Sequence, residues 1–151
     1  MQIESQNPPS QTPPSQFRLP NGLIGIGELK EFEILAAPES KPLFIMRALE
    51  PQPITFVVME PHDVIVGYQF TISDEDAAEL DLTPGGEAPA ILNIVTVESL
   101  DPQVVTVNLT APILVNRKTG LGKQVVIENF DKYSTKHTLL GDTKTILDVI
   151  G

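Results

Sequence analysis

Short apolar runs, broken by turn residues, set the hydrophobic pattern of this chain. The runs lie at 17–19, 31–36, 43–49, 54–59, 68–72, 90–97, 104–111, 112–116 and 124–128, with the bend between the two that meet falling at Ala111-Pro112. They are rich in Val, Ile and Thr, whose stiff, branched side chains fit a pleated and half-buried surface, so each run predicts a strand. The run 54–59 is almost wholly apolar, which indicates a central strand buried on both faces.

A single helix stands out from this pattern. Ser73 precedes three acidic residues at 74–76, in the arrangement of a capping box with acids in the first turn. The helix ends before the Thr-Pro-Gly-Gly segment at 83–86. About nine short strands and one helix predict an all-β fold, a small and mostly antiparallel β-barrel or sandwich with one short helix.

The two ends of the chain differ from its middle. Residues 1–16 are mostly Pro, Gln and Ser and bring little apolar surface to a core. Such a segment does not offset the entropy lost on ordering, so we expect a disordered tail over 1–16. Residues 17–151 are expected to form one domain, in keeping with a length of 151 residues. Within it, the apolar residues 145–150 predict a last strand or a frayed helical turn.

Composition limits the classes of function. The chain has 41% hydrophobic residues, enough for a core, and no cysteine. A disulfide framework, a thiolate zinc site and a cysteine nucleophile are therefore excluded. The start lacks the basic and apolar regions of a secretory signal, and no apolar run approaches the roughly 20 residues of a membrane helix. We therefore expect a soluble, cytoplasmic protein that does not enter a membrane.

The charge of the chain is negative and unevenly placed. The net charge is −10, with a pI near 4.5, so the surface repels phosphate backbones and direct nucleic-acid binding is not expected. Lys and Arg are absent between Arg47 and Arg117, where acidic residues are frequent. This interval predicts either an acidic face that steers basic partners or a solvated face that keeps the protein soluble.

Candidate catalytic or metal-binding residues are few. His62 lies beside Glu60 and Asp63, a loop cluster that could hold a metal but matches no known spacing. His137 follows Ser134 too closely for the usual placement of a nucleophile and its base, and no G-x-S-x-G turn is present. We expect no enzymatic activity and no cofactor. The alternative is a small-ligand-binding or hydrolytic β-barrel that uses His62, His137 and Ser134.

Polar residues also interrupt or follow the apolar runs in the last third of the chain. The candidate partner-binding residues among them are Asn108, Asn116, Lys123, Gln124 and Tyr133. An Asn in a strand lowers β propensity, so its amide either contacts another chain or caps a turn or bulge. Tyr133 is either an exposed interface anchor or a rim residue that packs on the domain.

Several short motifs follow one another along the chain in a fixed order. They are L-P-N-G-L at 19–23, S-D-E-D at 73–76, I-V-T-V at 94–97, N-L-x-A-P-I-x-x-N at 108–116, G-K-Q at 122–124 and Y-S-T-x-H at 133–137. No single motif is specific, but the ordered set is. Together they resemble the signature of the FliW family of flagellar assembly factors, over about residues 17–140.

The resemblance implies a small, mostly antiparallel β-barrel that binds other proteins. In family terms, the protein binds flagellin and, alternately, the RNA-binding translational regulator CsrA. Flagellin bound to the factor leaves CsrA free to repress flagellin translation, and export of flagellin frees the factor to take up CsrA. An acidic face and exposed strand edges suit such protein partners. We expect a monomer, and the strong charge disfavours a structural subunit.

Overall fold

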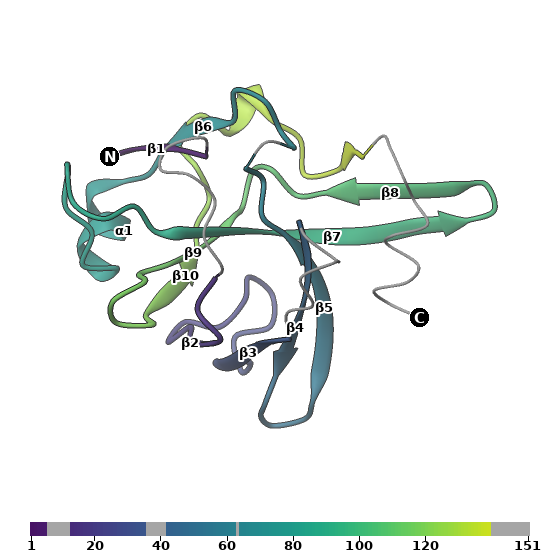
Figure 1. Cartoon of the computed structure of the whole chain (residues 1–151), viewed down its shortest axis with the longest axis horizontal. Coiled ribbons are helices and arrows are strands. Elements are labelled where there is room, and N and C mark those ends of the chain that lie inside the picture. Colours follow the sequence, from purple (N-terminus) through teal and green to yellow (C-terminus); the bar gives the residue numbers. More distant parts are fainter. Residues whose placement is uncertain (6–12, 36–41, 63, 140–151) are drawn as a thin grey trace.

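The computed structural model describes residues 1–5, 13–35, 42–62 and 64–139 (Figure 1). The strands are β1 Gln2–Glu4, β2 Gln16–Arg18, β3 Glu31–Leu35, β4 Leu43–Ala48, β5 Ile54–Met59, β6 Gln69–Thr71, β7 Ala90–Leu100, β8 Gln103–Val107, β9 Ile113–Val115, β10 Gly122–Gln124 and β11 His137–Thr138. The helices are α1 Asp74–Glu79 and the 3-10 helix η2 Phe130–Lys132. Neither is long and apolar enough to cross a membrane. The element predicted at 145–150 lies outside the described residues.

Most of the strands belong to one antiparallel sheet. Its order is β10-β9-β7-β5-β4-β3-β2, with β8 paired to β7 and β11 paired to β8. A separate two-stranded sheet joins β1 to β6. In the described part of the chain, an isolated bridge between Arg18 and Leu121 joins the outer strands of the large sheet, and no continuous ladder closes it. The predicted all-β fold is confirmed, as sandwich-like sheets and not as the closed barrel that the family resemblance implied.

Strand β7 holds the large sheet together (Figure 1). It pairs with β9 at residues 90–92, with β5 at 93–95 and with β8 at 95–100. Its buried side chains alternate, because Ile91 belongs to one apolar cluster and Leu92 to another. Successive side chains of a strand point to opposite faces, so the sheet separates two apolar cores.

The two cores differ in what covers them. The first core lies under β1, β6 and α1 and contains Tyr68, Phe70 and Leu80. The second core lies under β2, β3, β4 and the 19–29 loop, and in it the rings of Phe17 and Phe32 stack with centroids 5.5 Å apart. Each core buries a few aromatic rings among many aliphatic side chains.

The predicted helix is confirmed with its cap. The Ser73 Oγ accepts a hydrogen bond from the Asp76 main-chain N–H at 3.0 Å, and the helix ends at Glu79. This cap satisfies one of the N–H groups that the first turn of a helix leaves free. The apolar run at 124–128 is different, because β10 ends at Gln124 and the rest of the run forms no strand. There Val125 and Ile127 donate main-chain hydrogen bonds to the 110–112 turn instead.

The prediction that β5 is buried on both faces is wrong for its first half. Val58 and Met59 are buried, but Ile54 is 39% exposed and Thr55 is also exposed. The reason lies in the pairing, since β5 contacts β4 along its whole length but β7 only at residues 57–59. Figure 1 shows the consequence, because the β4–β5 and β7–β8 hairpins point in different directions.

The N-terminal prediction is wrong where the structure describes the chain. Strand β1 pairs with β6 in register, and the Met1 amino group donates to the Ile72 carbonyl at 2.9 Å. Ile3 is only 4% exposed and belongs to the first core. Gln16 already begins β2. Composition alone suggested that the entropy lost on ordering would keep this segment disordered. A single buried isoleucine and a ladder of main-chain hydrogen bonds offset that entropy.

Replacing Ile3 with Ala should lower stability by at least about 2 kcal/mol, because it leaves a cavity in the first core. For a domain of this size we expect the melting temperature to fall by roughly 5 °C or more. Thermal unfolding followed by circular dichroism measures the change. Glu4→Ala is the matched control, since Glu4 is exposed on the same strand. Equal melting temperatures for the Ile3 and Glu4 variants would contradict the packing of β1.

Candidate functional site

Asn108 caps the turn that joins β8 to β9. Its Oδ1 accepts hydrogen bonds from the main-chain N–H groups of Thr110 and Ala111, both at 3.0 Å. Its own N–H donates to the Ile94 carbonyl of β7 at 3.0 Å. The side chain is half-buried, and its Nδ2 donates to no atom of the described residues. Asn108 thus combines a structural carbonyl oxygen with an amide nitrogen available to a partner.

Asn116 has both ends of its amide engaged. The Nδ2 donates to the carbonyl oxygens of Leu80 at 2.9 Å and Asp81 at 3.3 Å, just beyond α1. The Oδ1 accepts from the N–H groups of Lys118 and Thr119 in the turn before β10. The residue is buried. Of the two readings of Asn116, the geometry favours the turn cap, with a second role in fastening the end of α1 to β9.

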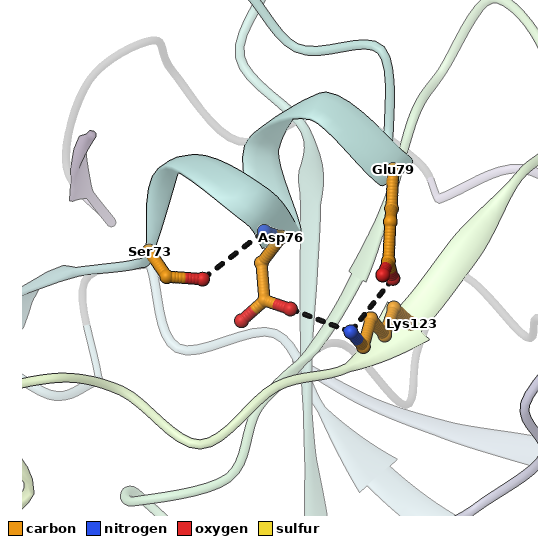
Figure 2. A network of polar contacts seen from close by, with 4 residues as sticks. All are labelled: Ser73, Asp76, Glu79 and Lys123. Carbon is orange, nitrogen blue, oxygen red and sulfur yellow. Dashed lines mark hydrogen bonds and ion pairs between the residues drawn. The ribbon is translucent and has the colours of Figure 1, made fainter.

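Lys123 clamps β10 to α1 (Figure 2). Its Nζ lies 2.5 Å from a carboxylate oxygen of Asp76 and 2.7 Å from one of Glu79. Partial burial is the largest single influence on the pKa of Lys123 and lowers it. The hydrogen bonds and charges of the two carboxylates together outweigh burial, so the pKa lies above its ordinary value. The ammonium group is therefore held by this chain's own acids.

Gln124 ties the 23–26 loop to the domain. Its Oε1 accepts from the Ile24 N–H at 2.8 Å, and its Nε2 donates to the Ala111 carbonyl at 3.1 Å. The side chain is only 9% exposed. Gln124 therefore fixes the position of the loop that carries Ile24, whose own side chain is exposed.

Tyr133 packs over β6. Its ring meets the ring of Tyr68 edge-on, with centroids 5.0 Å apart. Its hydroxyl donates to the Gln69 carbonyl at 3.0 Å and accepts from the Gln69 N–H at 3.2 Å. The side chain stays half-buried. Of the two readings of Tyr133, the geometry favours the packed rim residue.

Tyr68 and Asn93 form a buried hydrogen-bond network behind Asn108 that the sequence patterns did not indicate. The buried Tyr68 hydroxyl donates to the Leu109 carbonyl at 2.6 Å and accepts from Asn93 Nδ2 at 3.2 Å. Burial raises the pKa of Tyr68, and the hydrogen bond from Asn93 only partly opposes it. Asn93 also donates to the Asn108 carbonyl at 2.9 Å, which links this network to the cap. An Asn inside the apolar run 90–97 was the available signal.

The structure brings two of the five predicted residues to one surface feature. Asn108 and Gln124 line a groove of about 270 Å³ between the 23–26 loop and strands β5, β7 and β8. Asn116 and Lys123 instead meet at α1, and Tyr133 lies against β6. We call the first feature the β5–β8 groove.

The β5–β8 groove combines apolar and polar groups. Phe56 and Ile94, both half-buried, pack against the second core and contribute apolar surface to it, and Ile24 forms an exposed apolar wall. Glu98 and Lys136 add opposite charges, 3.8 Å apart at their nearest atoms. Apolar surface with a few polar groups is typical of a binding site.

The candidate catalytic and metal residues take part in separate local contacts. His62 Nδ1 lies 2.9 Å from the Ser5 carbonyl oxygen. Ser134 Oγ accepts from the Lys136 N–H at 3.0 Å, and His137 is exposed on β11. Among the described residues, no three His, Cys, Asp or Glu side chains form a group suited to a metal ion.

Fold and groove together define a class, that of small antiparallel β-sheet proteins with one short helix and a mixed apolar and polar surface groove. A profile of the FliW protein family matches residues 5–139. A flagellar assembly factor FliW from Natranaerobius thermophilus is 36% identical over 126 residues, or 83% of this chain and 82% of that protein. Another from Thermosipho africanus is 33% identical over 118 residues, or 78% and 80%.

Comparison of structures gives the same result. A crystal structure of the flagellar assembly factor FliW superposes with a TM-score of 0.71 and 31% sequence identity. The match covers 84% of this chain and 86% of that one. The chain therefore belongs to the FliW family, as its ordered motifs indicated.

Proposed function

We propose that this protein is a flagellar assembly factor that binds flagellin and, alternately, a CsrA-type translational regulator. By taking up the regulator it relieves repression of flagellin translation, and by taking up flagellin it lets repression return. The observation that carries the proposal is the FliW match over residues 5–139, nearly the whole chain. Its partners are proteins, it acts without enzymatic turnover, and it works in the cytoplasm, where both partners are made.

The β5–β8 groove is the surface that we assign to partner binding. Asn108 contacts the partner directly in this proposal, because its Nδ2 is not used within the described part of the domain. The other four predicted residues act indirectly. Gln124 holds the loop that walls the groove, and Asn116, Lys123 and Tyr133 fix α1 and β6.

The acidic interval supports a basic partner. Asp74 and Glu75 on α1 are exposed and face solvent, whereas Asp76 and Glu79 share Lys123. Uncompensated carboxylates raise the encounter rate with a basic surface and contribute less to the lifetime of the complex.

The association rate with the regulator should fall at least about tenfold between roughly 0.01 and 1 M salt, because the Debye length shrinks from about 30 to 3 Å. Stopped-flow mixing with the purified regulator measures the rate. The double variant Asp74→Asn, Glu75→Gln should show a slower low-salt rate, and Glu31→Gln, an exposed acid outside the interval, serves as control. A rate that is independent of salt would rule out electrostatic steering.

Size-exclusion chromatography with each purified partner tests the proposed function. The full chain should co-elute with monomeric flagellin and, separately, with the regulator. In a mixture of all three, excess flagellin should displace the regulator from the complex. If neither partner co-elutes at micromolar concentration, the proposal fails. If both bind at once, alternation fails while binding stands.

A further inference from the structure

Strands β5 and β7 are paired at only three positions and then separate. Val57 pairs with Val95 and Met59 with Asn93, with Val58 and Ile94 between them. The same register would next pair Phe56 with Thr96 and then Thr55 with Val97, but neither pair forms. Both strands nevertheless continue past this point, β5 alongside β4 and β7 alongside β8. A gap therefore opens between two strand edges.

Two hydrogen bonds fix which way the main-chain groups point. The Glu60 N–H donates to the Pro42 carbonyl at 3.0 Å, so even-numbered residues of β5 face β4. The Ile94 carbonyl accepts from the Asn108 N–H, so even-numbered residues of β7 face β8 up to the bulge. Main-chain groups alternate in direction along a strand, so those of Thr55 and Val97 point into the gap.

The two edges are unequal as templates for a further strand. Pro53 has no N–H, which blunts the β5 edge just before Thr55. The β7 edge continues without a proline to Leu100, and an irregularity between Val97 and Ser99 shifts its register with β8. A bulge of this kind increases the local twist of the strand.

The surroundings of the gap specify what kind of chain it suits. Phe56 and Ile94, which line the β5–β8 groove, flank the gap with apolar surface. Acidic residues lie further along both strands, with Glu50 and Asp101 exposed at the tips of the β4–β5 and β7–β8 hairpins. Glu98 lies in the groove. Its Oε1 accepts a hydrogen bond from the Thr106 hydroxyl and lies 3.8 Å from the Lys136 Nζ. No Lys or Arg occurs from residue 48 to 116.

We propose that the β7 edge at Val97 takes an extended segment of the protein partner as an added strand. The segment pairs through its main chain with the Val97 N–H and C=O, and places alternate apolar side chains toward Phe56 and Ile94. Lys or Arg residues in the segment meet the carboxylates of Glu98 and Asp101. Strand addition of this kind draws affinity from main-chain hydrogen bonds and specificity from alternate side chains. This assignment rests on the proposed function, since it names how that partner binds.

Amide hydrogen exchange, followed by NMR on the full chain, tests the assignment without mutation. In the free protein the Val97 amide should exchange much faster than the Thr96 amide, which faces β8. Saturating flagellin or regulator, whichever co-elutes with the chain, should slow exchange at Val97 at least about tenfold. A partner that co-elutes and leaves Val97 exchange unchanged, or protects Thr55 alone, overturns the assignment and leaves the proposed function standing.

A variant gives the second measurement. Val97→Pro removes the N–H that faces the gap and should weaken partner binding about tenfold, by the loss of one hydrogen bond. Val97→Thr keeps the N–H and a β-branched side chain, and should bind within about threefold of the parent chain. Equal affinities for a folded proline variant and the threonine variant would overturn the proposal. If the proline variant does not fold, the exchange result decides.

Two further arms separate the remaining outcomes. A synthetic peptide of alternating Val and Lys serves as a probe that does not depend on the natural partners. If neither flagellin nor the regulator co-elutes, the proposed function fails. The peptide then tests strand addition by itself: protection of the Val97 amide supports it, and unchanged exchange overturns it. Protection of Val97 that appears in the free protein and grows with its own concentration assigns the edge to a second copy and overturns the proposal.

Discussion

Gly22→Ala should destabilise the domain by about 4 kcal/mol, the largest effect that we expect from a single methyl group. Gly22 has a φ of 69°, and a Cβ built there lies 2.4 Å from the Gly27 carbonyl oxygen. A left-handed backbone costs an alanine roughly 1–2 kcal/mol, and forcing atoms into a packed site costs roughly 1–3 kcal/mol more. The atoms in the way are main chain, so the loop itself must move. Denaturant unfolding measures the loss of stability.

Gly25→Ala is the matched control for this prediction. Gly25 has a φ of 86°, but its added Cβ meets nothing within 4 Å. The control therefore carries the backbone cost alone, about 1–2 kcal/mol. The difference between the two variants isolates the close approach of Gly22 to Gly27. Equal losses would show that the 22–27 loop is not packed as described. Since this loop walls the β5–β8 groove, the Gly22 variant should also lose partner binding.

Asn116→Ala should cost about 3 kcal/mol of stability, because it removes four hydrogen bonds that are buried or partly buried. The carbonyls of Leu80 and Asp81 lose a donor, and the N–H groups of Lys118 and Thr119 lose an acceptor. The melting temperature should fall by roughly 6 °C or more. A variant with the parent melting temperature that no longer binds partner would restore Asn116 as an interface residue.

Asn108 gives the contrasting case. Asn108→Asp keeps the carbonyl oxygen that caps the 108–111 turn and replaces only the Nδ2. We expect stability within about 1 kcal/mol of the parent chain together with weaker partner binding, since an amide donor is exchanged for an acceptor. Asn108→Ala removes both groups and should lose stability as well. A folded Asn108→Asp variant with unchanged affinity would make the residue a cap and nothing more.

Local sequence patterns were enough to predict most of the fold. Branched apolar runs located β3, β4 and β7, and the Ser73 cap located α1, because these features depend on neighbours in sequence. The roles of the two asparagines depend on distant residues. Nothing near Asn116 indicates that its amide meets Leu80, and nothing near residue 54 indicates that β7 turns away from β5. Sequence patterns therefore singled out five polar residues, of which Asn108 and Gln124 line the β5–β8 groove, and left their division into caps and contacts undecided.

The pairing of β1 with β6 has a consequence for how the chain acquires its structure. Residues 2–4 leave the ribosome long before residues 69–71, and their ladder cannot form until the later strand exists. Closing so long a loop carries an entropic delay that adjacent strands such as β3 and β4 do not face. Nascent chains that have not yet reached Thr71 therefore keep Ile3 in water. In stalled or truncated products Ile3 should therefore be open to protease and should promote aggregation, while the adjacent strands β3 and β4 are already paired and protected.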